Sequence, residues 1–362
     1  MHLALGLVAD AALVAAAVLV VSAGGWRLAD APGVVARSAV LVPVVALAVV
    51  AFGIRACTFP VHGWLPLVES RVAIPAAAVL SGAVVKLGLV GWLRLLPLGE
   101  VAMPGWGTGL VVAALVGAFT AVLPGLLTDD AEVSLGYSTV SQLGFITVLV
   151  GVALAAPPLA EACVLSAVVY AVHHGMAKGG LVLAVLVWER HGGRLRVLVL
   201  AGTALLALAV VGAPLGSGAV AKYAAKRALG AEAYLDDLVA VLPLIATIST
   251  LILLRTAVVL RRHVRPGPVG PDVGFLAWAV LCLGGTIGTW YLAEQWVPVV
   301  AVPALDRVTL WQATWPVLLG LALAAAGAAA ARAGLVPSRL RRVRLPRGDL
   351  VALVQRVLDS RR

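Results

Sequence analysis

The sequence predicts an all-α, polytopic membrane protein with about ten transmembrane helices. Of its 362 residues, 62% are hydrophobic and 12% are charged, and the mean hydropathy is +1.05. Soluble chains carry about 25% charged residues, and no soluble core of this size would use so much apolar surface. The composition therefore excludes a set of soluble domains, a disordered protein and a fibrous protein.

Apolar runs give the expected crossings, because a transmembrane helix needs about 20 apolar residues. The runs are 3–23, 34–56, 73–96, 108–127, 134–154, 160–187, 196–229, 238–260, 273–293 and 310–333. The first lacks a basic leader and a cleavage site of small residues, so we expect a crossing and not a signal peptide. The seventh is longer than a bilayer needs and holds several glycines and a proline within 212–218, which predicts one discontinuous crossing. If it were two crossings, the orientation below would invert.

Basic residues predict the orientation. With ten crossings both termini share one side, which also holds most loop arginines: Arg71, Arg190, Arg194, Arg196, Arg261, Arg262, Arg265 and the tail from Arg332 to Arg362. Such loops favour the cytoplasm, which predicts a multi-pass protein of the cell inner (plasma) membrane with both termini cytoplasmic. This distribution also accounts for the +10 net charge without a nucleic-acid partner. Within the basic tail 336–362, apolar residues at helical spacing predict an amphipathic cytoplasmic helix on the inner leaflet or a partner, with a solvated tail as the alternative.

No motif for catalysis or cofactor binding is recognisable. Cys57, Cys163 and Cys282 are isolated in apolar runs, which excludes a disulfide framework and a CxxC metal or iron–sulfur site. There is no glycine-rich phosphate loop, nucleophile elbow or pair of carboxylates. We expect this chain to have no catalytic chemistry and no cofactor of its own.

Lys86 is the first ionisable residue expected deep in the membrane. It follows Pro75 by eleven residues, about 16 Å along a helix. A lysine near the bilayer centre costs about 2.5–3.5 kcal/mol on insertion scales and marks an ion pathway by default. The alternative is that its ammonium reaches an interface by snorkelling. Since no carboxylate lies one turn away in sequence, a neighbouring helix or water must satisfy it.

The sixth crossing carries three polar residues in register. Tyr170, His174 and Lys178 are spaced i, i+4, i+8, so they share one face of the helix. Histidine titrates near neutrality, and burial destabilises a charged lysine, so the three are a candidate relay for protons. Ordinary hydrogen-bonded core residues are the alternative. His173 points about 100° away and is expected to be structural.

Four further residues are candidates. Lys222 follows the interruption at 212–218, where freed carbonyls and water could stabilise a cation. Arg55 stays protonated, which suits anchoring or electrostatic tuning better than proton release. Asp10 and Glu161 are the available acids, and each either pairs with a lysine or lies near an interface.

Several motifs resemble a known family, the proton-translocating antiporter-like membrane subunits. These subunits occur in respiratory complex I, membrane-bound hydrogenases and multisubunit cation/proton antiporters. Phe59–Pro66 is similar to the family's Pro-x-His-x-Trp-Leu-Pro signature, and Val79–Gly88 to the lysine-bearing helix after it. Gly136–Gly144 resembles the Ala-Tyr-Ser-Thr-Val-Ser-Gln-Leu-Gly element. His174–Lys178 and Gly218–Lys222 match the next histidine/lysine helix and the second broken helix. The resemblance covers about residues 40–260.

The resemblance implies two inverted five-helix repeats, each with a broken helix, around a central polar axis. In that scheme Lys86 and Lys178 are connecting lysines, His174 is a bridge and Lys222 is the exit-side lysine. The expected division is a transmembrane domain over 1–335 and the tail. The domain comprises a truncated first repeat (about 1–155), a second repeat (about 156–262) and extra helices (273–333).

This sequence departs from the family at four points. Arg55 stands where the first repeat's key lysine is expected, and Tyr170 stands for the first bridging histidine. Glu132-Val133 replaces a Lys-Arg pair, and the helix with the glutamate partner of the key lysine is expected upstream of this sequence. Asp10 does not match that glutamate by position.

Two hypotheses follow. The first is a proton-conducting subunit of a multisubunit membrane complex. Protons would move among Lys86, His174, Lys178 and Lys222. Any redox cofactor would belong to partner subunits of an NADH-quinone oxidoreductase-like or hydrogenase complex. Another membrane subunit could supply the missing helices. The second is a non-conducting structural or coupling subunit, favoured by Arg55. A further alternative is a transport module that uses the proton gradient to drive sodium exchange or inorganic-carbon uptake. The sequence leaves the coupling partner open.

Overall fold

The computed structural model describes residues 2–262, 270–296 and 306–335, and over these ranges the chain is helical and has no strand. Eight helical segments are long and apolar enough to cross a membrane. Leu41–Arg55 and Leu195–Val211 are shorter apolar helices at the positions of the second and seventh expected crossings. The predicted all-α membrane fold is confirmed, while the count of ten crossings stays a prediction. The tail over 336–362 and Arg265 lie outside the described residues.

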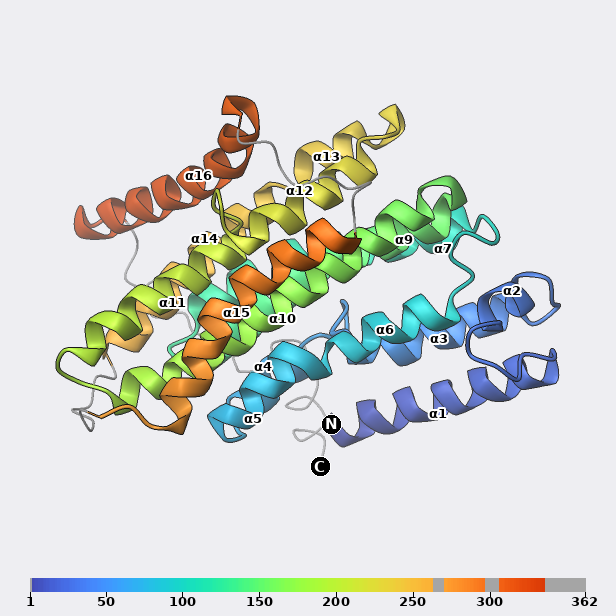
Figure 1. The fold of residues 1–362 in the computed structure, drawn as a ribbon, viewed down its shortest axis with the longest axis horizontal. Coiled ribbons are helices and arrows are strands. Elements are labelled where there is room, and N and C mark those ends of the chain that lie inside the picture. Colours follow the sequence, from blue (N-terminus) through green and yellow to red (C-terminus); the bar gives the residue numbers. More distant parts are fainter. Residues whose placement is uncertain (1, 263–269, 297–305, 336–362) are drawn as a thin grey trace.

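The helices run in the order shown in Figure 1. They are α1 (His2–Ser22), α2 (Ala31–Ala36), α3 (Leu41–Arg55), α4 (Trp64–Glu69), α5 (Ile74–Val79), the π-helical turn η1 (Leu80–Val84), α6 (Lys86–Leu95), α7 (Pro104–Thr120), α8 (Val122–Leu127), α9 (Ala131–Ala155), the 3₁₀ turn η2 (Pro157–Leu159), α10 (Ala160–Arg190), α11 (Leu195–Val211), α12 (Ser217–Leu229), the 3₁₀ turn η3 (Ala233–Leu235), α13 (Asp236–Val241), α14 (Leu244–Arg262), α15 (Val273–Trp296) and α16 (Arg307–Arg332).

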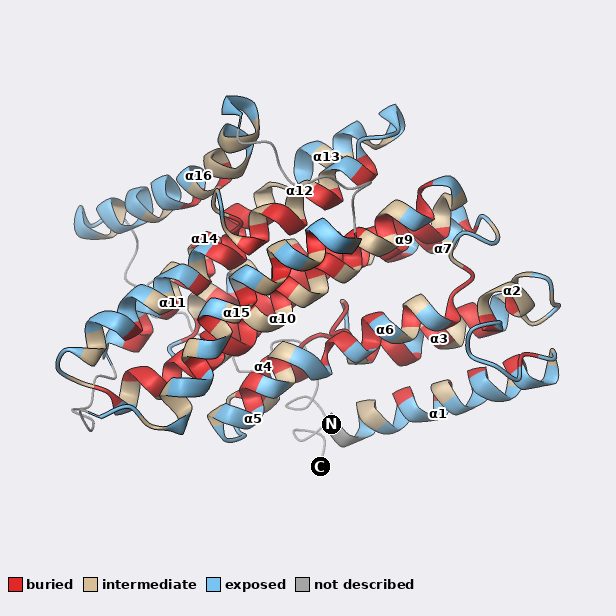
Figure 2. Ribbon diagram, viewed as in Figure 1, coloured by how far each residue is buried: buried red, intermediate tan, exposed pale blue. Residues whose placement is uncertain are grey.

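The centre of the bundle is formed by α9 and α10. Helix α9 contacts α7, α10 and α14, while α10 also contacts α12, α11 and α15. Almost every residue of α9 is buried, whereas α1 and α16 leave long apolar faces exposed, as Figure 2 shows. Small residues permit the close packing, since a Cβ added to Gly107 of α7 would lie 2.4 Å from the carbonyl oxygen of Gly151 on α9. The ionisable groups of α10 are thus held at the most enclosed part of the molecule.

The second broken helix lies where the sequence predicts it. Helix α11 ends at Val211 and α12 begins at Ser217. Gly212 has φ +80°, a left-handed conformation that suits glycine and ends α11. A Cβ on Gly218 would lie 1.9 Å from the carbonyl oxygen of Ala209, so glycine is required where the two half-helices touch.

A first broken helix was not placed by the sequence. The expected crossing 34–56 is divided between α2 and α3, and the chain then continues through 56–63 into the short helix α4. This connection contains a cis peptide bond between Phe59 and Pro60. The indole Nε1 of Trp64 donates to the carbonyl oxygen of Ile54 at 2.8 Å, tying α4 back to the end of α3. Pro60 and Pro66 mark the interruption, but the apolar run itself gives no sign of it.

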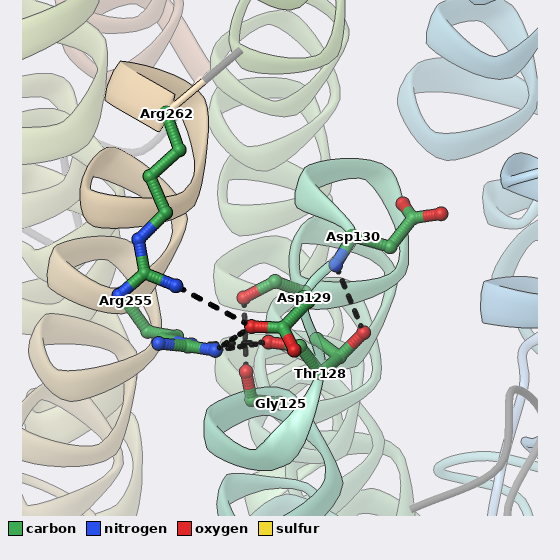
Figure 3. Close-up of polar contacts among 7 residues, drawn as sticks. Gly125, Thr128, Asp129, Asp130, Arg255 and Arg262 are labelled. Carbon is green, nitrogen blue, oxygen red and sulfur yellow. Dashed lines mark hydrogen bonds and ion pairs between the residues drawn. The ribbon is translucent and has the colours of Figure 1, made fainter. Parts of the chain in front are cut away.

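One end of the bundle is fastened by an arginine cluster (Figure 3). Arg255 of α14 donates to the carbonyl oxygen of Thr128 at 2.7 Å and to Oδ1 of Asp129 at 2.6 Å. Arg262 lies 3.7 Å from the same carboxylate. Asp130 accepts from the backbone N–H groups of Glu132 and Val133 and so caps α9.

A second contact joins basic loops at an end of the bundle. Nη1 of Arg190 lies 3.3 Å from Oδ2 of Asp272, which joins the end of α10 to the start of α15. The backbone N–H of Phe275, together with Arg190, holds the pKa of the Asp272 carboxyl below its ordinary value. Which side of the membrane these loops face stays a prediction.

Candidate functional site

The chain has four lysines, Lys86, Lys178, Lys222 and Lys226, against 23 arginines. Lys86 and Lys178 are buried, and Lys222 and Lys226 are half-buried at the broken helix α12. Lysine can release its proton when it is desolvated, whereas arginine stays charged. Two of the four cations able to exchange protons are therefore buried in the bundle, and the other two lie at the broken helix.

Lys86 is held by a local change in helix geometry. The residues before it form the π-helical turn η1, in which the backbone N–H of Val85 bonds the carbonyl of Leu80 at 3.2 Å. The ammonium of Lys86 donates to the carbonyl oxygen of Ser81 in the same turn. Its direct protein partner thus lies five residues earlier in the chain, in the turn before α6, and a further contact with water stays a prediction. π-Helical turns are frequent at functional sites.

A polar thread joins Lys86 to Lys178. The hydroxyl oxygens of Ser81 and Thr139 are 2.7 Å apart, and Thr139 Oγ1 also donates to the carbonyl oxygen of Leu135 at 3.2 Å. The ammonium of Lys178 donates to that same carbonyl at 3.2 Å. The two lysines also interact electrostatically. Helix α9 thus supplies the bridge between the lysine of η1–α6 and the lysine of α10.

His174 lies one turn before Lys178 and is fully buried. Neither ring nitrogen has a protein hydrogen bond. Lys86, Lys178 and Lys222 all exert an electrostatic effect on this imidazole. Two buried polar atoms without a protein partner are costly unless water satisfies them, so His174 occupies a position suited to a hydrated link among the three lysines.

His173, expected to be structural from its angle on the helix, contacts the second broken helix. Its Nδ1 lies 2.8 Å from the Ser217 hydroxyl, at the first residue of α12. Its Nε2 has no hydrogen-bond partner and would lie 3.0 Å from a Cβ on Gly218. Lys222 acts on the ring electrostatically. His173 therefore faces the broken helix, while His174 is a buried imidazole on which all three lysines act electrostatically.

The Tyr170 hydroxyl belongs to a separate chain of hydrogen bonds. It donates to Oε1 of Gln142 at 2.6 Å, and Nε2 of Gln142 donates to the Ser249 hydroxyl at 2.6 Å. Tyr170 shares the buried face with His174 and Lys178, as expected, but its hydroxyl is directed to α9 and α14. Its ring meets that of His173 edge-on at 6.0 Å. This geometry supports a positioning role for Tyr170.

Lys222 lies across the break between α11 and α12. Its ammonium donates to the carbonyl oxygens of Val211 at 2.6 Å and Val210 at 3.3 Å. These carbonyls are free because α11 stops there. Lys222 and Lys226 both line a cavity of about 100 Å³, and Lys226 donates to Gln312 of α16 at 2.8 Å. The cavity has room for several water molecules. Its wall is mostly apolar, so Lys222, Lys226 and Gln312 are among its few polar groups, and the sequence did not predict it.

The two acids proposed from the sequence do not meet these lysines. Asp10 of α1 is ion-paired with Arg55 of α3, so it serves the arginine. Glu161 is exposed in the first turn of α10, 17 residues before Lys178, or about 26 Å along the helix. A third acid, Glu69 of α4, was missed: it is fully buried and interacts electrostatically with Lys86 and Lys178. Its sequence neighbours Ser70 and Arg71 are typical of a surface loop, which concealed it.

The described residues contain no group of three or more histidine, cysteine, aspartate or glutamate side chains arranged to hold a metal ion. The three cysteines are separate, buried thiols. The polar groups that the described residues gather in the bundle thus include lysines, histidines and hydroxyls, all of which carry exchangeable protons.

Comparison with known proteins identifies the class. The family model described as NADH:quinone oxidoreductase/Mrp antiporter, TM, matches residues 1–217. The chain therefore belongs to this family of antiporter-like membrane subunits, as its motifs indicate.

Two curated relatives come from Escherichia coli. Formate hydrogenlyase subunit 3 is 34% identical over 154 residues, covering 41% of this chain and 25% of the relative. Hydrogenase-4 component B is 34% identical over 145 residues, covering 38% of this chain and 22% of the relative. The matched part is thus about a quarter of the length of these relatives.

Solved structures share the fold. A chain of the Mrp complex from Dietzia sp. DQ12-45-1b superposes with a TM-score of 0.68 and 22% identity, covering 90% of this chain and 39% of that one. A chain of the membrane-bound sulfane sulfur reductase, an archaeal respiratory membrane complex, superposes with a TM-score of 0.66 and 19% identity, covering 96% and 62%. At these identities the likeness concerns the fold.

Proposed function

We propose that this chain conducts protons as an antiporter-like subunit of a multisubunit membrane complex. The Ser81 and Thr139 hydroxyls, with water, would carry protons between Lys86 and Lys178, while the backbone carbonyls of Ser81 and Leu135 hold the two ammonium groups. From Lys178 the route would continue through His174, His173 and Ser217, again with water, to Lys222. One observation carries the proposal: Lys86, Lys178 and Lys222 each donate to backbone carbonyls, and within the described residues none has a carboxylate within 4 Å. A carbonyl accepts from an amine and from an ammonium alike, so each lysine can change its charge without losing its partner.

Coupling between the sites follows from Coulomb's law. Charges interact more strongly in a low-dielectric interior than in water, and Lys86 and Lys178 act on one another and on His174. A proton taken up by one lysine therefore favours release from its neighbour. Alternating uptake and release would follow changes of state in partner subunits.

The relatives support a setting in a membrane complex. Formate hydrogenlyase and hydrogenase-4 components and subunit M of NADH-quinone oxidoreductase are among them. We place this chain in the cell inner membrane with both termini cytoplasmic, beside other membrane subunits that hold any redox centres. The first and second repeats would span about 1–155 and 156–262, followed by the helices over 273–333.

A second candidate is a structural subunit that does not conduct. The ion pair of Arg55 with Asp10 favours it, because arginine does not release its proton at the position where the family carries a lysine. This ion pair is at the first broken helix and bears on proton transfer in the first half alone. Lys178 and Lys222 belong to the second half, which the pair does not contact within the described residues.

The test uses the purified complex containing this chain, reconstituted in liposomes with a pH-sensitive dye inside. Lys178→Ala and Lys222→Ala should each reduce proton translocation at least tenfold while the complex remains assembled. Arg227→Ala, an exposed position on α12, is the matched control and should not change the rate. Unchanged translocation in both lysine variants would exclude conduction by this chain. Repeating the assay with a sodium gradient, or with bicarbonate, distinguishes proton-driven exchange from proton transfer alone.

A further inference from the structure

Glu69 is a buried carboxylate at the end of α4. Its side chain is fully buried, and neither carboxylate oxygen has a hydrogen bond that satisfies both distance and angle. The Ser81 side chain interacts with it. Leaving such a group in a protein interior is expensive unless it is neutral, hydrated or near opposite charge. A residue kept at that cost needs an explanation.

A glycine on α9 leaves room for the Glu69 carboxylate. A Cβ on Gly136 of α9 would lie 2.7 Å from Oε2 of Glu69 and 2.9 Å from Cα of Pro66. Gly136 is adjacent to Leu135, whose carbonyl accepts from Lys178. Ser81 hydrogen-bonds Thr139 on the same thread. The carboxylate thus lies alongside the polar thread between Lys86 and Lys178.

Glu69 differs from the carboxylates that make direct ion pairs in this chain. Asp129 meets Arg255 at 2.6 Å, and Asp10 meets Arg55. Glu69 interacts electrostatically with both Lys86 and Lys178, yet it lies beyond 4 Å of any basic group in the described residues. The negative carboxylate is near both lysines and is ion-paired with neither. It therefore stabilises the ammonium form of either lysine.

We propose that Glu69 is a proton-carrying residue between Lys178 and Lys86, an inference that rests on the proposed function. In one step the Lys178 ammonium loses an N–H bond and becomes an amine, and the proton forms an O–H bond on the Glu69 carboxylate, through the Ser81 and Thr139 hydroxyls or water. In the next step the carboxyl loses that proton to the amine of Lys86, which becomes an ammonium. No electron is transferred, and the pair of steps can run in either direction.

The test compares Glu69→Gln, Glu69→Asp and Glu161→Gln in the liposome assay described above. Glutamine keeps the shape and cannot ionise, so E69Q should reduce translocation per assembled complex at least tenfold. E69D should retain part of the rate with an altered pH profile, because the carboxyl is shorter but still titrates. E161Q, an exposed control on α10, should leave the rate unchanged.

Two outcomes overturn the inference. The first is a wild-type rate of translocation in E69Q together with a loss in Lys178→Ala and Lys222→Ala. That result would refute the role of Glu69 and leave the proposed function intact. The other is a fall in melting temperature in E69Q and E69D without a change in rate per complex, which makes Glu69 a packing residue. If E69Q does not assemble, E69D decides: a wild-type rate and pH profile would refute the proposal, and a reduced rate with a shifted profile would support it.

Discussion

The ammonium of Lys222 lies 2.6 Å from the carbonyl oxygen of Val211, the last residue of α11. The negative end of the α11 dipole therefore faces the cation. This contact spans the break in the helix, so the position of Lys222 depends on the conformation of Gly212 between the two half-helices. A lysine held by carbonyls at a helix break can remain hydrogen-bonded in both of its protonation states.

Gly212→Ala should displace Lys222. A Cβ there would lie 2.7 Å from Cδ of Lys222, and the residue has φ +80°, which costs a non-glycine residue about 1–2 kcal/mol. Gly334→Ala is the matched control, since Gly334 has φ +75° and no heavy atom within 4 Å of its Cβ position. We expect reduced translocation per assembled complex in G212A and none of that loss in G334A. Equal rates in both variants would contradict the proposed place of Lys222 in the route.

Gly218→Ala should destabilise the contact between the half-helices. The added Cβ would lie 1.9 Å from the carbonyl oxygen of Ala209, and overpacking of this kind costs about 1–3 kcal/mol or more. Gly109→Ala in α7 adds the same methyl group where nothing lies within 4 Å. In thermal unfolding of the detergent-solubilised protein, the midpoint of G218A should lie below the wild-type value, and that of G109A should equal it. A wild-type midpoint in G218A would mean that the break tolerates a side chain.

Much of the fold and part of the site follow from local sequence. Hydropathy locates most crossings, and the glycines at 212–218 locate the second break, because both depend on residues close together in the chain. The i, i+4, i+8 spacing likewise places Tyr170, His174 and Lys178 on one buried face. These are properties of single helices.

The remaining features depend on contacts between distant segments. Asp10 and Arg55 are 45 residues apart, and their pairing requires α1 to pack on α3. Glu69 resembles a loop residue until α4 folds against α9. His173 acquires a partner because α12 begins beside it, and Tyr170 turns its hydroxyl to Gln142 because α9 lies on that side. Helical periodicity gives the direction of a side chain but not what it meets.

Tyr170→Phe should reduce stability and leave most of the translocation. Its hydroxyl donates to Gln142 at 2.6 Å, so phenylalanine leaves a buried amide oxygen without a donor, at a cost of about 1–3 kcal/mol. The unfolding midpoint of Y170F should fall. The double variant Tyr170→Phe with Gln142→Leu should lose less than the sum of the single losses, because the unsatisfied oxygen is removed. A tenfold loss of translocation in Y170F would instead place the phenol on the proton route.

Asp10→Asn should be more harmful than its exposed position suggests. Asp10 lies in the middle of α1, and its carboxylate is the ion-pair partner of Arg55, whose other hydrogen bond is to the carbonyl oxygen of Ala51 at 3.4 Å. An arginine that loses its counter-ion among apolar membrane helices is costly. D10N should therefore reduce the amount of assembled protein, and the double variant Asp10→Asn with Arg55→Gln should recover it, since neither charge is then present. Fluorescence-detected size exclusion measures the amount of assembled protein. If the loss in the double variant equals the sum of the losses in D10N and R55Q, the two side chains are not coupled. Translocation per assembled complex should stay near the wild-type value in the double variant, because the proposed route passes through Lys178 and Lys222 and does not include Arg55.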